Sequence, residues 1–409
     1  MLDQRVVVTG IGAVTPIGLN IDEFWQGLIK GRSGVGMITL FDSAKYPIKI
    51  AAEVKGFDPA KYMSLKRADR TGRCTQFAIA AAKMALESSG LEMTRVNRER
   101  VGVVIATTGM VSLNAEYGEV IKNRPSRIDP LFMTKSGQCM VPSQVGLELG
   151  AKGLNTSVNS ACASGSDSLG AALSYIRAGY ADVIFAGGAE AGVNPVSLAV
   201  CARVGALSRE PDPKKASRPF DLKRDGFVLG EGSGMLMLES LEHALRRGAT
   251  ILAELAGVGW SFDAFNETAP DAEQEAAAMR NALQNARTAA TEVDYINAHG
   301  TSTKLNDSTE TRAIKLALGE RARQIPVSSN KSMIGHLACA AGSVEAVATV
   351  LTISRGILPP TVNYEVPDPE CDLDYVPNQA RPQMVNTCLS NSFGMGGQNC
   401  CLVIKRYKE

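Results

Sequence analysis

Apolar runs alternate with longer amphipathic stretches along most of the chain. Two stretches repeat apolar residues at helical spacing, 75–90 and 163–179, and predict helices. Short runs of mostly apolar residues predict buried strands at 5–10, 100–109, 181–188 and 234–240. Alternation of buried strands with helices is typical of an α/β fold.

The second half of the chain repeats this pattern in the same order. The stretch 251–260 corresponds to the opening strand, 273–287 to the first helix, 292–302 to the strand at 100–109, 336–356 to the helix at 163–179, and 396–409 to 230–243. We therefore expect a duplicated α/β unit, with one half at 1–250 and the other at 251–409. The proline-rich and charged stretch 208–226 predicts a long surface loop within the first half.

Composition narrows the class of protein. The 409 residues are 45% hydrophobic, which is enough for a large core. The formal net charge is +1, from 43 basic and 42 acidic residues, which argues against nucleic acid or an acidic membrane as partner. The start of the chain is unlike a signal peptide, and no apolar run reaches the ~18 residues of a membrane span. The nine cysteines show no C-x-x-C spacing, so we expect a cytoplasmic protein with reduced thiols and no metal site.

One glycine motif suggests a function that its surroundings exclude. Gly10 and Gly12 follow the first strand, as in a dinucleotide-binding loop. Such a loop requires Gly or Ala at the next motif position, where this chain has Thr15 followed by Pro16. We expect no nicotinamide cofactor.

Cys162 lies among alanines, serines and glycines, directly before the predicted helix at 163–179. A nucleophile on a sharp strand-to-helix turn needs small neighbours of this kind, because substrate must approach a crowded backbone. The positive end of the helix dipole is expected to lower the thiol pKa below its free value of about 8.5. The alternative is a small buried hydrophobic residue, which is our interpretation of the other eight cysteines.

A nucleophilic cysteine needs partners for protons or charge. His299 and His336 each follow apolar residues at a glycine-flanked loop, and both lie in the second half of the chain. Lys331 lies five residues before His336. His243 lies among charged residues and is expected at the surface. The glycine-rich stretch 389–399 follows an apolar strand and could present backbone N–H groups to an oxyanion.

These motifs together resemble the elongating β-ketoacyl-acyl carrier protein synthases over essentially the whole chain. The resemblance rests on SACASG (160–165), AHGTST (298–303), NKSMIGH (330–336) and NSFGMGG (391–397), in this order. It implies a thiolase-like duplicated fold with five layers, α/β/α/β/α. It also implies a homodimer, or a heterodimer with an inactive sister subunit, and no cofactor or metal. Both substrates would arrive on the phosphopantetheine of acyl carrier protein.

The resemblance also implies roles for individual residues. Cys162 would carry the acyl chain as a thioester, and His299 and His336 would bind the malonyl thioester oxygen. The backbone N–H groups of Cys162 and Phe393 would form the oxyanion hole, with Phe393 as a gatekeeper. Further positions would support this site: Lys331, Glu345, Asp307 and Glu310 as charged neighbours, and Thr301 and Thr303 as ligands of the pantetheine arm.

Two further groups follow from the resemblance. Gly109, Phe132, Ala161 and Cys201 would line the acyl pocket, and small residues at 109 and 201 should enlarge it. The acidic carrier would dock on basic residues at Lys66, Arg67, Arg70 and Arg203, with Arg73 and Arg209 nearby. The chain departs from the family's common residues at Met395, Gln398 and Asp167, the last of which is commonly a histidine.

Several functions compete at this point. The first is condensation in fatty-acid elongation, and the second is the same chemistry in a type II polyketide or polyene pathway. A non-catalytic partner subunit that sets chain length is disfavoured by Cys162 and the two histidines. A thioester hydrolase is also disfavoured, because nothing in the sequence marks a site for activating water. Thiolases carry a second catalytic cysteine near the C-terminus, and priming synthases carry asparagine where this chain has His336.

Overall fold

The computed structural model describes residues 4–108, 118 and 122–408. Ten strands form one mixed sheet, in the order β10-β9-β13-β14-β8-β1-β7-β6-β4-β5. The first half supplies β1 (Val6–Val14), β4 (Val101–Ala106), β5 (Asn155–Val158), β6 (Val183–Ala191) and β7 (Glu231–Ser240). The second half supplies β8 (Ala253–Phe262), β9 (Tyr295–Asn297), β10 (Val327–Ser328), β13 (Thr387–Phe393) and β14 (Gln398–Lys405).

The two halves of this sheet have the same topology. The order β1-β7-β6-β4-β5 in the first half matches β8-β14-β13-β9-β10 in the second, and the parallel and antiparallel pairings correspond. The halves join through β1 and β8, which pair only at Val7↔Glu254 and Val8↔Ala253. This topology confirms the predicted repeat. The boundary at residue 250 falls between α9 (Leu241–Arg246) and β8, and its status as a domain boundary stays a prediction.

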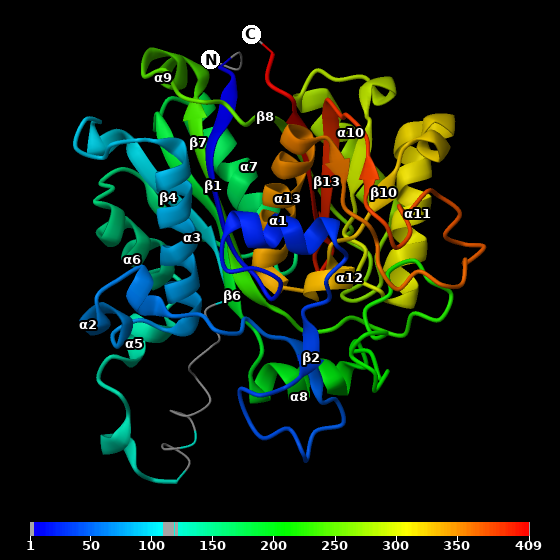
Figure 1. Cartoon of the computed structure of the whole chain (residues 1–409), viewed down its shortest axis with the longest axis horizontal. Coiled ribbons are helices and arrows are strands. Elements are labelled where there is room, and N and C mark those ends of the chain that lie inside the picture. Colours follow the sequence, from blue (N-terminus) through cyan, green and yellow to red (C-terminus); the bar gives the residue numbers. More distant parts are fainter. Residues whose placement is uncertain (1–3, 109–117, 119–121, 409) are drawn as a thin grey trace.

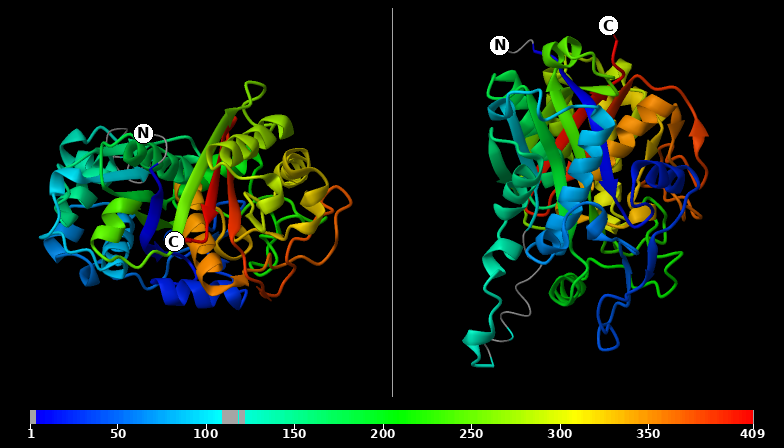
Figure 2. Two further views of the ribbon diagram at one scale, coloured as in Figure 1. Left: turned by 90° about the horizontal axis from the view of Figure 1, so that it is seen from above. Right: turned by 60° about the vertical axis from the view of Figure 1, so that its left-hand side comes forward.

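Helices complete a five-layered arrangement (Figure 1). Helices α3 (Arg73–Ser89) and α6 (Met140–Leu149) cover the outer face of the first half-sheet. Helices α7 (Ser164–Arg177) and α13 (Ala341–Arg355) lie between the half-sheets, and α10 (Ala272–Asn285) and α11 (Lys304–Leu318) cover the second. Seen from above, these layers follow one another across the molecule (Figure 2). The expected α/β class with five layers is therefore confirmed.

Smaller elements surround these layers. The short helices are α1 (Ile21–Ile29), α2 (Leu65–Ala68), α5 (Phe132–Ser136), α8 (Pro195–Val204) and α12 (Lys331–Ile334). Two minor sheets pair β2 (Val35–Met37) with β3 (Ile50–Ala52) and β11 (Ile357–Leu358) with β12 (Arg381–Pro382). Within the described ranges, no helix has the length and apolar character needed to cross a membrane.

The central layer belongs to both halves. One large hydrophobic cluster runs from β1 through α7 and α13 to β14, and the α13 residues from 341 to 353 are all buried. Two glycines let α7 and α13 approach each other closely. A Cβ at Gly165 would come within 2.6 Å of the Ser343 nitrogen, and one at Gly342 within 2.4 Å of the Ser166 hydroxyl. The small residues around Cys162 therefore also serve helix packing.

The packing of α3 on β1 explains Gly10 and Gly12. A Cβ at these positions would lie 2.0 Å from the Ala85 carbonyl oxygen and 1.9 Å from the Ala81 carbonyl oxygen. Glycine is therefore required at both positions because the strand and the helix are in close contact there.

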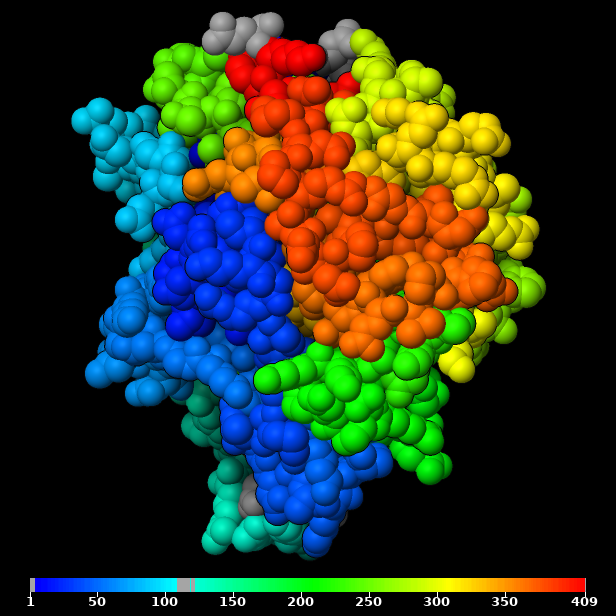
Figure 3. All heavy atoms as spheres, turned by 45° about the vertical axis from the view of Figure 1, so that its right-hand side comes forward, coloured from blue at the N-terminus to red at the C-terminus, as the bar shows by residue number. Residues whose placement is uncertain are grey.

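The stretch 208–226 is irregular, as predicted, and part of it is exposed, but residues 216–221 are all buried, so the prediction of a surface loop is wrong for that part. Phe220 and Asp221 are fully buried, and the Phe220 ring stacks on Tyr375 at 4.0 Å between centroids. The Leu222 N–H donates to the Val366 carbonyl. Figure 3 shows this green segment lying directly below the orange segment of the second half. Proline and charge correctly predicted a loop. Its one aromatic residue, Phe220, and the buried Asp221 attach it to the second half.

Candidate active site

The predicted catalytic residues meet at one cavity of about 460 Å³. Cys162, His299, His336 and Phe393 line it, together with Thr301, Thr303 and the glycine loop 394–397. The cysteine comes from the first half and the other three come from the second. We call this space the Cys162 cavity.

Cys162 lies on a strained turn between β5 and α7. The preceding residue, Ala161, has φ of 50°, a left-handed conformation that is uncommon for alanine. The Ser164 hydroxyl accepts a hydrogen bond from the Ser160 N–H (2.8 Å) and donates one to the Ala161 carbonyl (2.6 Å). A Cβ at Gly394 would lie 2.6 Å from the Ser160 carbonyl oxygen. The turn therefore needs both its hydroxyl clamp and the glycine loop facing it.

The expected lowering of the Cys162 pKa is wrong. Burial raises the pKa of the thiol, although the backbone N–H groups of Met395 and Cys162 and the Lys331 charge favour the thiolate. The resting residue is thus a thiol whose anion is stabilised by groups already in place. The sequence showed the helix that follows Cys162, but it did not show that segments distant in sequence leave the residue only half exposed.

Both active-site histidines present an N–H to the cavity. The Ala338 backbone N–H donates to Nδ1 of His336 at 3.1 Å, and Nζ of Lys331 lies 3.4 Å from Nδ1 of His299. Since each Nδ1 accepts a hydrogen bond, the proton of each neutral ring is on Nε2. The ring centroids lie 5.5 Å apart, and His299 also contacts the Phe393 ring at 5.8 Å. Burial lowers the pKa of both imidazoles well below the ordinary value, reinforced by the Lys331 charge and, for His299, by His336.

Lys331 and Glu345 form a buried ion pair behind His299. Their Nζ and Oε1 atoms lie 2.5 Å apart, and both side chains are almost completely inaccessible to solvent. Burial raises the pKa of Glu345, and Lys331 opposes that shift. The pair holds a positive charge beside His299 and fixes its tautomer.

Glu310 and Asp307 hold the loop that follows His299. The Glu310 carboxylate accepts from the N–H groups of His299 (2.8 Å) and Gly300 (2.7 Å), and burial raises its pKa to about 7. Asp307 accepts from the N–H groups of Ser302 and Phe220 at 3.2 and 2.7 Å. Both predicted acidic residues therefore bind backbone groups and lie outside the Cys162 cavity.

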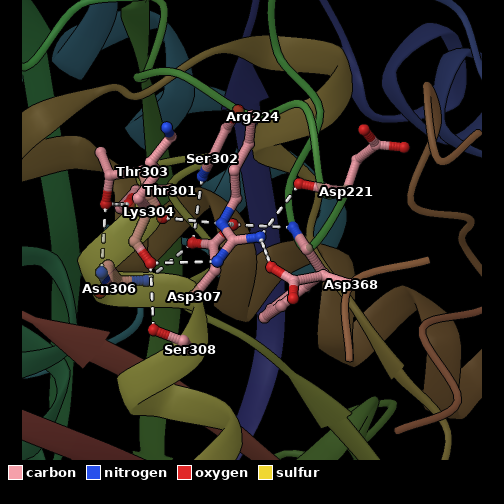
Figure 4. A network of polar contacts seen from close by, with 12 residues as sticks. Asp221, Arg224, Thr301, Ser302, Thr303, Lys304, Asn306, Asp307, Ser308 and Asp368 are labelled. Atoms are coloured by element: carbon pink, nitrogen blue, oxygen red, sulfur yellow. Dashed lines mark hydrogen bonds and ion pairs between the residues drawn. The ribbon is translucent and has the colours of Figure 1, made fainter. Parts of the chain in front are cut away.

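Arg224, which the sequence did not single out, anchors the same loop (Figure 4). Its guanidinium donates to the carbonyls of Thr303 (3.1 Å) and Lys304 (3.0 Å) and pairs with Asp307 and Asp368. The hydroxyls of Thr301 and Thr303 lie 2.9 Å apart beside this network. The sequence did not distinguish Arg224 from its neighbours, because the stretch 208–226 is rich in charged residues of the kind expected at a solvated surface.

The register of β13 and β14 directs the Phe393 N–H toward the site. The Gly394 N–H bonds the Gln398 carbonyl, so Phe393 and Asn399 form a non-hydrogen-bonded pair. The Phe393 N–H consequently points away from β14. On that side β9 pairs only with residues 388–390 of β13, which leaves the edge at Phe393 open to the Cys162 cavity.

The structure places the predicted acyl-pocket residues less closely together. Ala161 adjoins Cys162, and Cys201 lies half-buried on α8. Burial raises the pKa of Cys201, and the thiolate form of Cys162 would raise it further. Phe132 lies half-buried on α5, and neither it nor Cys201 lines the Cys162 cavity. Gly109 lies outside the described residues.

The predicted docking residues are exposed with two exceptions. Lys66 and Arg70 are exposed at α2, and Arg203 and Arg209 are exposed at and after α8; Arg203 directly precedes the 204–206 rim of the Cys162 cavity. Arg67 is half-buried and pairs with Glu148 at 3.6 Å. Arg73 is half-buried and pairs with the buried Glu231 at 2.7 Å, so its charge already has a structural partner, and its assignment to the docking surface stays a prediction.

The prediction of a surface position for His243 is also wrong. Its Nδ1 lies 2.5 Å from the carboxylate of the fully buried Glu239, which also binds Arg247 and Thr9. Burial by itself would raise the pKa of Glu239, but these three hydrogen-bonding partners lower it to about 2. His243 therefore has a structural partner far from the Cys162 cavity.

Comparisons with known proteins agree with this geometry. The N-terminal domain model of beta-ketoacyl synthase matches residues 3–244, and the C-terminal domain model matches residues 252–365. A curated protein of Synechocystis sp., 3-oxoacyl-[acyl-carrier-protein] synthase 2, is 46% identical over 410 residues, covering 99% of each chain. The protein of the same name from Coxiella burnetii is 46% identical over 411 residues, again covering 99% of each.

Solved structures give the same result at the level of the backbone. "The ishigamide ketosynthase/chain length factor" superposes with a TM-score of 0.93 at 38% identity, covering 99% of this chain and 100% of that one. A type II PKS acyl-carrier protein in complex with its ketosynthase, AntDE:AntF, gives 0.92 at 36% identity with the same coverage.

Proposed function

The chain belongs to the beta-ketoacyl synthase family, and on that basis we propose that it is a 3-oxoacyl-acyl carrier protein synthase of fatty-acid elongation. It would condense malonyl-acyl carrier protein with an acyl group held on Cys162. The products would be 3-oxoacyl-acyl carrier protein and carbon dioxide. The reaction needs no metal or organic cofactor beyond the phosphopantetheine of the carrier.

One observation carries this proposal. A half-buried thiol and two neutral imidazoles, each with its Nε2–H available, face one cavity. Two N–H donors without a positive charge suit an oxygen that becomes negative only during the reaction. The arrangement therefore fits formation of an enolate beside an acylated cysteine.

The first half-reaction transfers the acyl chain. The Cys162 sulfur attacks the carbonyl carbon of the acyl thioester. The resulting oxyanion accepts hydrogen bonds from the backbone N–H groups of Cys162 and Phe393. The bond to the pantetheine sulfur then breaks, and the proton lost by Cys162 ends on that leaving thiol. The N–H of Met395 and the charge of Lys331 stabilise sulfur as it becomes anionic.

The second half-reaction forms the carbon–carbon bond. The bond between the malonyl carboxylate and the neighbouring carbon breaks, releasing carbon dioxide and leaving its electron pair in an enolate. The enolate oxygen accepts hydrogen bonds from Nε2 of His299 and His336. The enolate carbon attacks the acyl carbonyl on Cys162, the carbon–sulfur bond breaks, and the thiolate takes up one proton from solvent, which replaces the proton that left with the pantetheine thiol.

The proposed macromolecular partners follow from the surface. An acidic carrier protein would dock where the exposed Lys66, Arg70 and Arg203 lie, with its pantetheine entering past Thr301 and Thr303. A second copy of the chain would pair with β5, the edge strand of the large sheet. A solved relative is a ketosynthase in complex with an acyl-carrier protein, which supports the first of these partners.

The test is acylation of the pure protein. Intact mass spectrometry after incubation with acyl-carrier thioesters should show one added acyl mass, absent in Cys162→Ala. The same variant should still release carbon dioxide from malonyl-acyl carrier protein, because His299 and His336 remain. Failure of acylation with every donor would overturn the proposal for the chain acting alone.

A second function is favoured by the solved relatives. Two of them are named as ketosynthases of ishigamide and of a type II polyketide system. The same chemistry would then extend polyene or polyketide chains, with a sister subunit as partner. A panel of saturated, unsaturated and 3-oxo donors separates the two: preference for saturated chains supports fatty-acid elongation, and preference for the others supports the second function.

A further inference from the structure

Asp167 joins the nucleophile turn to a strand of the other half. It lies in the first turn of α7, five residues after Cys162. One carboxylate oxygen, Oδ2, accepts a hydrogen bond from the Ser160 hydroxyl. The other, Oδ1, accepts one from Nε1 of Trp260 on β8 at 2.7 Å. A single carboxylate thus links the residue two positions before the nucleophile to the second half of the molecule.

The turn that Asp167 holds needs such support. Ala161 is held at φ 50° between Ser160 and Cys162, and this conformation persists only when its surroundings impose it. The Ser164 hydroxyl fixes the backbone of the turn, and Sγ of Cys339 lies 3.4 Å from the Ala161 carbonyl. These contacts hold the inner side of the turn. Asp167 holds the side chain of Ser160, on the side that faces β8.

Trp260 fixes Asp167 in turn. Its indole packs against α7 at Gly170, so closely that a Cβ at this position would lie 2.7 Å from the Trp260 ring. The Trp260 carbonyl accepts from the Asn281 side chain on α10 at 2.9 Å, which holds its backbone. These two contacts and the Asp167 carboxylate hold the ring against α7, with its N–H directed at Oδ1 of Asp167.

The chemistry explains why an acidic residue stands at this position. Ser160 and Trp260 both donate, so the residue between them must accept twice. A carboxylate has two acceptor oxygens, whereas a neutral imidazole would offer only one acceptor nitrogen. We propose that Asp167 and Trp260 are positioning residues, which hold the Ser160–Cys162 turn so that the Cys162 sulfur meets the acyl carbonyl in line with the oxyanion donors.

This inference rests on the proposed function, since it assigns Asp167 and Trp260 to the acyl transfer to Cys162. It predicts an effect on the oriented reaction and little effect on the intrinsic reactivity of the thiol. Acylation needs the sulfur, the carbonyl and two N–H donors in one geometry. Alkylation by iodoacetamide needs only an accessible sulfur.

The experiment compares the wild type with four single variants and with the double variant that combines Asp167→Ala and Trp260→Phe. Asp167→Ala removes both acceptors. Asp167→Asn keeps one oxygen acceptor for Trp260 and offers an N–H to the Ser160 hydroxyl, so it is the conservative rescue. Trp260→Phe removes only the N–H. Phe262→Leu is the matched control, because Phe262 is the next residue on the same face of β8 and is 58% exposed.

The measured quantities are the rate of Cys162 acylation at saturating acyl-carrier substrate, its KM, and the rate of iodoacetamide alkylation. We expect Asp167→Ala to lower the saturated acylation rate about tenfold, with KM and the alkylation rate within about twofold of wild type. Asp167→Asn should recover most of the rate. Trp260→Phe should lower it about threefold, and the double variant should be no slower than Asp167→Ala, because the two residues act as one unit.

Each contrary result identifies a different failure. A wild type that is never acylated overturns the proposed function and this inference with it. Wild-type acylation with an unchanged rate in Asp167→Ala overturns the inference alone. So does a parallel fall of acylation and alkylation, a loss confined to KM, or an Asn variant as slow as the Ala variant. Melting temperatures measured alongside identify variants that have not folded, and Trp260→Phe, at a side chain 44% exposed, then carries the test.

Discussion

Glu275 is a buried carboxyl group that the fold does not pair. It lies on α10 with no solvent exposure, and neither carboxylate oxygen has a hydrogen-bond partner. Burial raises its pKa well above the ordinary value, and the acidic neighbours Glu310, Asp263, Asp271 and Asp307 raise it further. The raised pKa favours the protonated acid in a mostly apolar layer. We expect Glu275→Leu to stabilise the protein.

The magnitude follows from two effects. An unsatisfied buried polar group costs about 1–3 kcal/mol, which the leucine removes while keeping a similar volume. Unfolding of a chain of this length changes entropy by roughly 0.9 kcal/mol/K, so the melting temperature should rise by about 1–4 °C.

The second effect depends on pH. A carboxyl whose pKa is raised by folding binds its proton more tightly in the folded state, so its stability contribution is complete below the unfolded value of about 4.5 and is lost as pH rises. Between that value and the folded pKa, wild type should lose up to about 1.4 kcal/mol per pH unit relative to the variant.

The assay is thermal and urea unfolding of both proteins from pH 5 to pH 8.5. Glu273→Leu is the control, because Glu273 is exposed in the first turn of the same helix. Its effect should be small and nearly independent of pH. A Glu275→Leu variant that is less stable than wild type at pH 8, or whose advantage does not widen with pH, would refute the reasoning about this carboxyl.

Three other predictions concern the site. Because burial lowers the pKa of His299 and His336, both stay neutral as pH falls through about 6.5; malonyl decarboxylation by Cys162→Ala should stay level there, and a fall centred near 6.5 would contradict this. Arg224→Lys keeps a charge but loses the planar set of donors, so we expect KM for malonyl-acyl carrier protein to rise about fivefold with kcat within twofold; steady-state kinetics would contradict this by showing a loss in kcat alone. Cys201→Phe should narrow the acyl pocket and lower acylation by the longest donors about tenfold relative to the shortest, and an unchanged profile across the donor panel would place Cys201 outside the pocket.

Much of the fold was predictable because buried strands and long helices have strong periodic patterns. Three of the five correspondences between the halves are strand pairs, and these reappear in the strand order of the large sheet as β8 with β1, β9 with β4 and β14 with β7. The other two are helix pairs, α10 with α3 and α13 with α7, which occupy matching layers. The strand-to-helix turn expected at Cys162 has its strand in β5, but β5 reads Asn-Thr-Ser-Val and is mostly polar rather than apolar, at one edge of the sheet. β10, at the opposite edge, escaped prediction because two residues are too few to show a periodic pattern.

Within the site, the sequence predicted residue types better than their environments. Cys162, His299 and His336 stand in small-residue motifs that identify a reactive turn and its partners. The direction of the Cys162 pKa depends on burial by segments distant in sequence, which no local pattern reports. Arg73 and Arg224 show the same difficulty. Both lie in charged stretches typical of a solvated surface, and both pair with buried carboxylates contributed by other segments.

The shared central layer has a consequence for synthesis of the protein. Helices α7 and α13 bury each other between the half-sheets, so the first half lacks one side of its core until the second half is made. As the ribosome releases the chain, Cys162 emerges long before His299, His336 and the glycine loop that complete its surroundings. The nucleophile would therefore gain its oriented reactivity only after synthesis of the last strands, and a truncated product would display the cysteine without the means to use it.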